Sequence, residues 1–205
     1  MAGLMRLGLF GGTFDPLHMA HLILAAEAHF QLTLDRVLWV LTPDPPHKDR
    51  RITAVEQRME MLDAAIVDNP NFESSRVDVD RGGPYYAVDT VKLLRTEYPR
   101  AQLVYLMGGD SLHDLTSWHL PRDFVAACDE LGVMRRPDDR VDLDSLEGEI
   151  PGLSAKVRFV NAPLLDISGT QLRHRIAAGQ PFRYYVPVSV YQIIQERDLY
   201  RWVVN

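Results

Sequence analysis

Short apolar runs alternate with stretches of helical periodicity along most of the chain. Between the runs, apolar side chains recur every three or four residues over residues 19–31, 55–66 and 88–94, as in amphipathic helices. The runs themselves have the length of buried strands: Leu7–Phe10, Val37–Leu41, Val77–Val79, Leu103–Met107, Leu131–Met134 and Val157–Val160. This alternation predicts an α/β fold, a doubly wound and mostly parallel Rossmann-like sheet with helices on both faces.

The loops that follow the predicted strands carry most of the candidate chemistry. Sheets of this kind bind ligands beyond the carboxyl ends of their strands, near the point where the strand order reverses. Four such loops are rich in glycine, histidine or cationic residues: residues 11–18 (GGTFDPLH), 42–48 (TPDPPHK), 108–111 (GGDS) and 166–173 (DISGTQLR). We therefore expect these side chains to converge on one edge of the sheet.

The composition is that of an ordinary globular protein, with 46% apolar and 24% charged residues in a chain of 205. We expect a single domain over residues 1–205, with the C-terminal helices from about residue 170 packed on the same core. The acidic segment Asp138–Gly152 has little apolar periodicity and is expected to be an exposed excursion. The single cysteine, Cys128, excludes an internal disulfide and fits a cytoplasmic protein. No stretch predicts a membrane span or a signal peptide.

The charge of the chain bears on its partners. The formal net charge is −6, and the arginines are scattered, with no basic stripe. A nucleic acid would therefore meet net repulsion. A small anionic substrate held by a few placed groups is compatible with this balance. Nothing in the apolar pattern sets the oligomeric state, and a homo-oligomer stays open.

The first loop has the features of a phosphate site. Gly11 and Gly12 directly follow a predicted strand, where residues without a side chain let the backbone turn sharply and approach a ligand. The helix that begins near Leu17 would aim unpaired N–H groups at the same place. His18 and His21 are three residues apart, so both could donate to a transferring phosphoryl group. Two glycines alone would indicate a plain turn, but the histidines at this spacing favour a phosphate site.

The last loop predicts a second anion site. Ser168 or Thr170 is a suitable N-cap for a helix over residues 171–178, and Arg173 falls in its first turn. A hydroxyl, a helix N-terminus and a guanidinium together suit the outer phosphates of a nucleotide. The same residues also fit an ordinary capped helix with a solvated arginine. Taken with the first loop, they indicate a triphosphate and a second phosphate-bearing substrate.

Two motifs resemble those of a known superfamily. Residues 11–21, GGTFDPLHMAH, resemble the GTFDPxHxGH signature of the nucleotidyltransferases that share a class I aminoacyl-tRNA synthetase-like fold, and residues 167–173 resemble their ISSTxxR motif. Within that superfamily the chain resembles the nicotinate-nucleotide adenylyltransferases, from about Leu7 to Tyr200. The residues that carry this narrower resemblance are Pro45–Lys48, Tyr86–Thr90, Gly108–Ser111 and Trp118.

The resemblance implies a reaction in which ATP and nicotinate mononucleotide, with Mg²⁺, give deamido-NAD and pyrophosphate. The phosphate of the mononucleotide would attack the α-phosphorus of ATP in line, with no covalent enzyme intermediate. Such transfers depend on positioning and charge neutralisation more than on proton transfer. The catalytic residues that the resemblance implies are His18, His21, Lys48 and Arg173.

The resemblance also implies two sets of substrate contacts, whereas the protein ligands of Mg²⁺, if any, stay open. ATP would meet Gly11, Gly12, Thr13, Phe14, His18, His21, Gly108, Asp110, Arg136, Ser168, Thr170 and Arg173. The mononucleotide would meet Gly12, Thr13, His47, Lys48, Tyr86, Ala87, Thr90, Trp118 and His119. In the second set, Trp118 would stack on the pyridine ring, and backbone N–H groups near Tyr86 and Ala87 would receive the nicotinate carboxylate.

Four positions depart from the family pattern. The family usually has glycine at Ala20, a second serine at Gly169, threonine at Ala87 and tyrosine at His119. Glycine at position 169 removes one hydroxyl contact to phosphate. Ala87 and His119 flank the nicotinate pocket, so they bear on the preference for the acid over the amide.

Two alternatives to this function stay open. Nicotinamide mononucleotide or phosphopantetheine as acceptor would keep the chemistry, although pantetheine-phosphate adenylyltransferases typically have threonine at His18. A non-catalytic nucleotide-binding module would keep only the fold. Placing His18, His21, Lys48 and Arg173 around one phosphorus exceeds what affinity alone requires, and this favours the enzyme.

Overall fold

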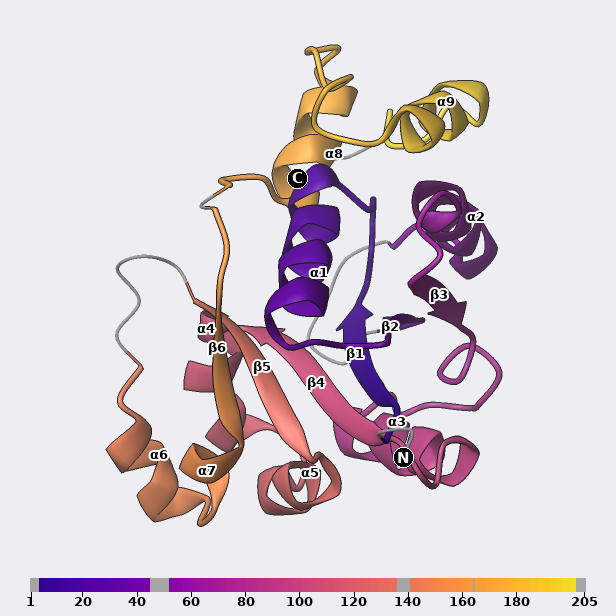
Figure 1. The fold of residues 1–205 in the computed structure, drawn as a ribbon. Helices are drawn as coiled ribbons and strands as arrows, with labels where there is room; N and C mark the ends of the chain where they lie inside the picture. Colours follow the sequence, from indigo (N-terminus) through magenta and orange to yellow (C-terminus); the bar gives the residue numbers. More distant parts are fainter. Residues whose placement is uncertain (1–3, 45–51, 136–140, 164, 202–205) are drawn as a thin grey trace.

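The computed structural model describes residues 4–44, 52–135, 141–163 and 165–201 (Figure 1). Its elements, in chain order, are β1 (Arg6–Gly12), α1 (Met19–Gln31), β2 (Arg36–Leu41), α2 (Val55–Ile66), β3 (Phe72–Ser75), α3 (Ala87–Glu97), β4 (Gln102–Gly108), α4 (Gly109–His113), the 3₁₀ helix η1 (Leu115–Ser117), α5 (Pro121–Ala127), β5 (Glu130–Arg135), α6 (Leu143–Glu149), α7 (Leu153–Lys156), β6 (Val157–Asn161), α8 (Gly169–Ala177) and α9 (Val188–Glu196). Within the described ranges, none of these helices combines the length and apolar character needed to cross a membrane.

The strands form one six-stranded sheet in the order β3-β2-β1-β4-β5-β6, and every pair is parallel. Phe10 on β1 lies opposite Trp39 on β2 and Leu106 on β4. The strand order therefore reverses between β1 and β4. The loops that follow these two strands meet at the place where such sheets bind ligands.

Helices cover both faces of the sheet, as the alternation predicted. Because successive strand residues point to opposite faces, Phe10 lies in one core cluster and its neighbour Leu9 in the other. The first cluster includes buried residues of α1, α2, α8 and α9, and the second those of α3, α4, α5 and α6. In Figure 1, α8 and α9 lie beyond the carboxyl ends of the strands, whereas α5 and α7 lie at the opposite end. The Rossmann-like fold class is confirmed.

The third strand differs from the prediction. Residues 77–79 form a turn, and β3 is formed instead by the preceding sequence FESS, at the edge of the sheet. A central parallel strand is covered on both faces and reads as a continuous apolar run, whereas this edge strand is only half-buried throughout. Its polar sequence therefore carried no strand signal, and the prediction for Val77–Val79 is wrong.

The acidic segment after β5 is also more ordered than predicted. From residue 141 onward it forms α6 and α7, and Asp142 caps α6 by accepting from the backbone N–H of Ser145 at 3.0 Å. Leu146 and Ile150 are buried in the second core cluster. They are four residues apart and so share one side of the chain despite the acidic residues between them. The described part of this segment is mostly exposed, as expected, but it is helical and anchored to the core by these two side chains.

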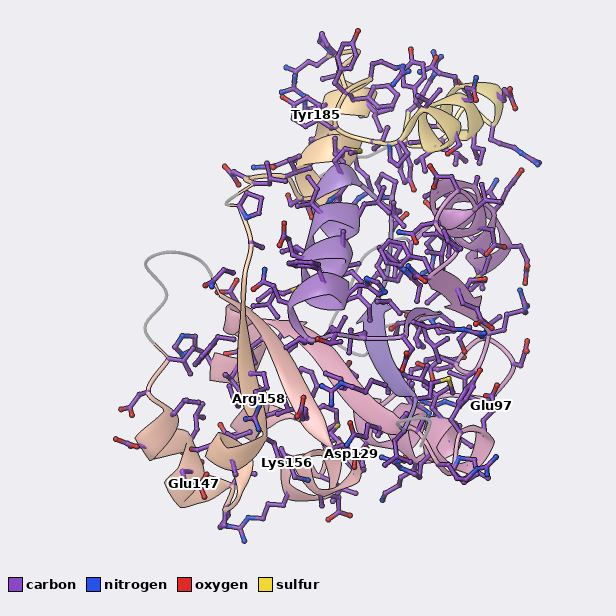
Figure 2. The ribbon with its side chains drawn as sticks, in the orientation of Figure 1. Glu97, Asp129, Glu147, Lys156, Arg158 and Tyr185 are labelled. Atoms are coloured by element: carbon purple, nitrogen blue, oxygen red, sulfur yellow. The ribbon has the colours of Figure 1, made fainter. Side chains whose placement is uncertain are left out.

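Polar contacts hold the end of the sheet at which the strands begin. Lys156 donates to three backbone carbonyls where α5 ends, and Asp129 accepts from the backbone N–H of Leu103 at 2.7 Å. Figure 2 labels Lys156 and Asp129 at this edge and Tyr185 at the far end, beside α8. These contacts fix the scaffold at the end of the sheet opposite the loops that carry the candidate chemistry.

Candidate active site

A cleft of about 450 Å³ lies at the carboxyl ends of β1 and β4, where the strand order reverses. Three segments far apart in the sequence line it: the loop after β1 with the start of α1, the end of β4 with the start of α4, and the connection from β6 into α8. The lining includes Thr13, Phe14, His18, His21, Gly108, Asp110, Ser168, Thr170 and Arg173. The structure therefore brings most of the residues expected around ATP to one place.

The loop after β1 is shaped by one buried aromatic ring. Phe14 adopts a left-handed backbone conformation, with φ of 46°, and its ring packs against Phe10 and Trp39. That packing offsets the cost of a conformation that non-glycine residues rarely adopt. A Cβ at Gly12 would lie 2.8 Å from the Phe14 ring, so glycine leaves the ring its place. The turn thereby places Thr13 in the wall of the cleft.

His18 and His21 form a stacked pair at the start of α1. His18 is the N-cap residue, and its ring centroid is 3.7 Å from that of His21. The backbone N–H of His18 donates to Nδ1 of His21 at 3.3 Å, so the proton of a neutral His21 ring sits on Nε2. Burial lowers the pKa of His18 to about 4, which keeps this ring neutral at physiological pH. The neutral His18 ring can therefore act as an N–H donor, and His21 can donate from Nε2.

One atom of this pair is left without a partner. Nδ1 of His18 is buried and makes no hydrogen bond to any described residue. A buried polar atom in this state costs free energy, so such atoms are normally paired. Because His18 lines the cleft, its ring is in reach of a polar ligand there.

Arg173 joins the last loop to the first. Its side chain is buried, Nη1 donates to the backbone oxygen of Asp15 at 2.6 Å, and Nη2 donates to the hydroxyl of Thr170 at 3.0 Å. The alternative of a solvated arginine is therefore wrong. Ser168 is the N-cap of α8: its hydroxyl accepts from the backbone N–H of Gln171, whose side chain accepts from the N–H of Ser168. Thr170, the other candidate cap, bonds Arg173 instead.

Gly169 has a steric reason to differ from the serine usual in the family. A Cβ at this position would lie 2.9 Å from the backbone oxygen of Asp15 and 3.3 Å from Nη1 of Arg173. A contact under 3.0 Å with a backbone atom cannot form unless the backbone moves. Glycine therefore lets α8 approach the first loop closely enough for the bond from Arg173.

The first loop contains a buried acid. Asp15 is 4% exposed, and its Oδ1 accepts from the hydroxyl of Tyr200 at 2.9 Å. Burial, with the nearby charge of Asp15, raises the pKa of Tyr200 well above its ordinary value, so the phenol stays protonated. No local sequence pattern predicts this contact, because its two partners are 185 residues apart.

A buried arginine of α2 fixes two of the ligand-side loops. Arg58 is 1% exposed, and Nη1 donates to the backbone oxygens of Thr13 at 2.8 Å and Thr42 at 2.9 Å. Nη2 donates to that of Pro43 at 2.6 Å. One guanidinium thus ties the loop after β1 to the loop after β2. Arg58 was not among the predicted site residues, although an arginine between apolar positions of an amphipathic helix was a usable signal.

The residues expected around the mononucleotide are brought only partly together. Ala87 and Thr90 line a second cavity of about 50 Å³, along with Asp78 and Tyr105. Gly11, which was expected around ATP, lines this smaller cavity instead of the cleft. The Ala87 position, where the family usually has threonine, thus borders this small cavity. The hydroxyl of Thr90 is engaged, donating to the carboxylate of Asp78 at 2.8 Å.

Three aromatic residues of that set line neither cavity. The ring of Tyr86 stacks on His119, with centroids 4.0 Å apart. Trp118 is half-buried and packs against Tyr105 and Phe124. Here the indole is thus held by core residues. Three further predicted site residues, His47, Lys48 and Arg136, lie outside the described residues.

Comparisons with known proteins agree with this geometry. Residues 9–175 match the model of the cytidylyltransferase-like family. A protein of Thermomicrobium roseum described as a probable nicotinate-nucleotide adenylyltransferase is 47% identical over 199 residues, which cover 97% of this chain and 92% of that protein. A protein of Exiguobacterium sibiricum with the same description is 39% identical over 196 residues, covering 96% and 99%.

Solved structures share the fold. A Plasmodium falciparum nicotinic acid mononucleotide adenylyltransferase complexed with NaAD is similar with a TM-score of 0.76 at 19% identity, over 98% of this chain and 100% of that one. The sequence relatives are far closer and extend over nearly the whole chain. The chain therefore belongs to the nicotinate-nucleotide adenylyltransferases, nucleotidyltransferase enzymes within the cytidylyltransferase-like family.

Proposed function

We propose that the cleft transfers the adenylyl group of ATP to nicotinate mononucleotide, giving deamido-NAD and pyrophosphate. The observation that carries this proposal is the convergence of His18, His21 and Arg173 on one cleft at the reversal of strand order. Membership of the family supports the choice of acceptor. This reaction is a step of NAD biosynthesis. The fold alone would not indicate it, because many nucleotide-binding proteins share that fold.

The triphosphate of ATP would lie between the N-terminal ends of α1 and α8. The first N–H groups of a helix have no partner within the helix and attract anions. Arg173, Ser168 and Thr170 would hold the outer phosphates, and His18 with His21 would face the α-phosphate. Gly108 and Asp110, which line the cleft at the end of β4, would lie on the ribose side.

The chemical step is a direct displacement at the α-phosphorus. A phosphate oxygen of the mononucleotide forms the new P–O bond as the bond to pyrophosphate breaks, so the protein needs no nucleophile of its own. The stacked imidazoles would donate to the oxygens on which charge increases, and Arg173 would neutralise the leaving pyrophosphate. Because His18 is neutral at physiological pH, it can stabilise this charge without giving up a proton.

The acceptor would bind around the smaller cavity. Ala87 is the first residue of α3, so its backbone N–H is free of helical bonding and suits the nicotinate carboxylate. The cavity of about 50 Å³ is small, so we expect Trp118 and the Tyr86–His119 stack to shift when the pyridine ring binds. His47 and Lys48 would contact the mononucleotide from the loop after β2.

Mg²⁺ would enter with ATP. The described carboxylates that line the cleft are Asp15, which is bonded to Tyr200, and the exposed Asp110. In the described ranges, no three His, Cys, Asp or Glu side chains are grouped so that they could hold a metal ion. This donor set fits an ion that is coordinated mainly by phosphate oxygens and water. When bound, the ion would lower the negative charge of the triphosphate.

The test is pyrophosphate release from ATP and Mg²⁺ by the purified protein, with three acceptors run side by side. We expect a large kcat/KM advantage for nicotinate mononucleotide over nicotinamide mononucleotide, and no release with phosphopantetheine. Equal values for the two pyridine nucleotides would keep the adenylyl transfer and contradict recognition of the carboxylate. If no acceptor gave pyrophosphate release, the proposed enzymatic activity would be overturned and a nucleotide-binding module would be favoured.

A further inference from the structure

The side chain of Arg81 spans the loop that leads into α3. Its Nε donates to Oδ1 of Asp78 at 2.8 Å, and its Nη1 donates to the backbone oxygen of Pro84 at 2.9 Å. Nη2 lies 3.4 Å from both the backbone oxygen of Tyr86 and the hydroxyl of Thr90. The guanidinium therefore contacts residues on both sides of the loop formed by residues 82–86.

The anchor of this arginine is itself fixed. Asp78 is buried, and its carboxylate accepts from the hydroxyl of Thr90 on α3 at 2.8 Å as well as from Arg81. A carboxylate with two such donors has little freedom to turn. Arg81 is thus held against the first turns of α3 and not only against its own loop.

The same contacts bear on charge at the smaller cavity. Asp78 lines the smaller cavity, and an unpaired carboxylate there would repel an anionic ligand. The ion pair with Arg81 offsets that charge. Ala87 borders the same cavity, and its N–H begins α3. Because the peptide is planar and trans, the Tyr86 carbonyl near Arg81 directs the N–H of Ala87 the opposite way.

We propose that Arg81 is a positioning residue that sets the acceptor preference of the enzyme. By holding the carbonyls of Pro84 and Tyr86, it fixes the backbone N–H groups that receive the pyridine carboxylate, and by pairing with Asp78 it removes the repulsion that this carboxylate would meet. The proposal rests on the proposed function, since it takes nicotinate mononucleotide as the acceptor. Arg81 itself touches neither substrate.

Arg76 provides a matched control in the same connection between β3 and α3. Its guanidinium pairs with Glu56 at 3.0 Å and with Asp80 at 3.2 Å, and its side chain is 43% exposed. The Arg81 side chain, at 17%, is much more buried. Both arginines therefore form ion pairs, but the bonds described for Arg76 reach acidic side chains and not the loop at residues 82–86.

The experiment compares Arg81→Met, Arg81→Lys and Arg76→Met in the full chain. KM and kcat are measured for both pyridine mononucleotides at saturating ATP, and KM for ATP at saturating acceptor, with the Tm of each variant. We expect Arg81→Met to raise KM for nicotinate mononucleotide by about tenfold or more, with KM for ATP unchanged, because only binding of the acceptor is lost. The preference over nicotinamide mononucleotide should fall by a similar factor, and Arg76→Met should match wild type.

Arg81→Lys keeps the charge and the pairing with Asp78 but lacks the planar fork that reaches two carbonyls. We expect it to fold and to lose part of the preference, so the test stands even where Arg81→Met does not fold. An unchanged preference in Arg81→Lys or in a folded Arg81→Met overturns the proposal, as do equal rises in KM for ATP and acceptor with a lowered Tm. Wild-type protein inactive on nicotinate mononucleotide would instead overturn the proposed function.

Discussion

The imidazole rings of His18 and His21 lie face to face, with centroids 3.7 Å apart and 21° between their planes. A hydrogen bond from the backbone N–H of His18 to Nδ1 of His21 adds a second link between them. Two imidazolium cations at this separation would repel each other, whereas neutral rings each keep an N–H for an oxyanion. The burial that lowers the pKa of His18 to about 4 therefore suits the role proposed for the pair.

The buried His18 should make the stability of the protein depend on pH. Its pKa is near 6.5 in the unfolded chain and about 4 in the folded one, so between these values the unfolded chain binds the proton more readily. Above about pH 6.5 the ring is neutral in both states, and the free energy of unfolding has its full value. As the pH falls toward 4, protonation of the unfolded chain lowers that free energy by roughly 3 kcal/mol in total. Urea unfolding at pH 7 and pH 5 should show about 2 kcal/mol of this loss.

The pH dependence can be assigned to His18 by substitution. His18→Asn removes the titrating ring, so the difference in the free energy of unfolding between pH 7 and pH 5 should shrink. His174→Asn, on the exposed side of α8, serves as the control and should leave that difference unchanged. If His18→Asn kept the full pH dependence, the burial of His18 would not be its source.

His21→Ala should act on the chemical step more than on binding. The change removes the N–H donor that we propose faces the α-phosphate, and the loss of such a donor typically lowers kcat by about 10²- to 10³-fold. Affinity for ATP should fall by less than about tenfold, since Arg173 and the helix N-termini remain. Pyrophosphate release gives kcat, and calorimetric titration with ATP alone gives the affinity. Unchanged turnover would remove His21 from catalysis.

Arg173→Met should weaken both the fold and ATP binding. The change leaves the backbone oxygen of Asp15 without its 2.6 Å bond, a loss worth about 1–3 kcal/mol in a buried place, and it removes a cation from the cleft. KM for ATP should rise and the free energy of unfolding should fall. Arg175→Met is the control on the same helix, because Arg175 donates to the backbone oxygen of Pro181 and lies over the ring of Tyr185. Equal effects of the two changes would contradict the role of Arg173.

The sequence predicted most of the fold because the central strands are covered on both faces. The runs at Val37–Leu41 and Leu103–Met107 are apolar for that reason, and both are strands in the structure. The helices at residues 19–31 and 55–66 were found with the bounds they have. β3 was missed because an edge strand need not be apolar, and α6 because only Leu146 and Ile150 mark its buried side.

The candidate site could be predicted only where its residues are close in the sequence. His18 with His21, and Ser168 with Arg173, lie within one or two helical turns, so their spacing alone indicates shared chemistry. Arg58, the pair of Asp15 with Tyr200, and Arg81 were missed. Arg58 donates to backbone oxygens and Asp15 accepts from the hydroxyl of Tyr200, and only tertiary packing brings these groups together. Arg81 contacts its own loop and the start of α3, and the sequence does not reveal the conformation of that loop.

Gly169→Ser should lower activity and stability, although it introduces the residue usual in the family. The added Cβ would lie 2.9 Å from the backbone oxygen of Asp15, an atom already held by the bond from Arg173. Relieving that contact requires α8 to move away from the first loop, which separates the two segments that we propose to bind phosphate. Overpacking of this kind costs about 1–3 kcal/mol, and we expect kcat/KM for ATP to fall by about tenfold.

The control for this change is Gly148→Ser on α6, where an added Cβ would meet no atom within 4 Å. Urea unfolding and pyrophosphate release on both variants separate a general effect of serine from the contact with Asp15. A gain in kcat/KM for Gly169→Ser at unchanged stability would contradict the steric argument. It would mean that the serine hydroxyl reaches phosphate without displacing α8, and that this chain works with one hydroxyl contact fewer than the fold can accommodate.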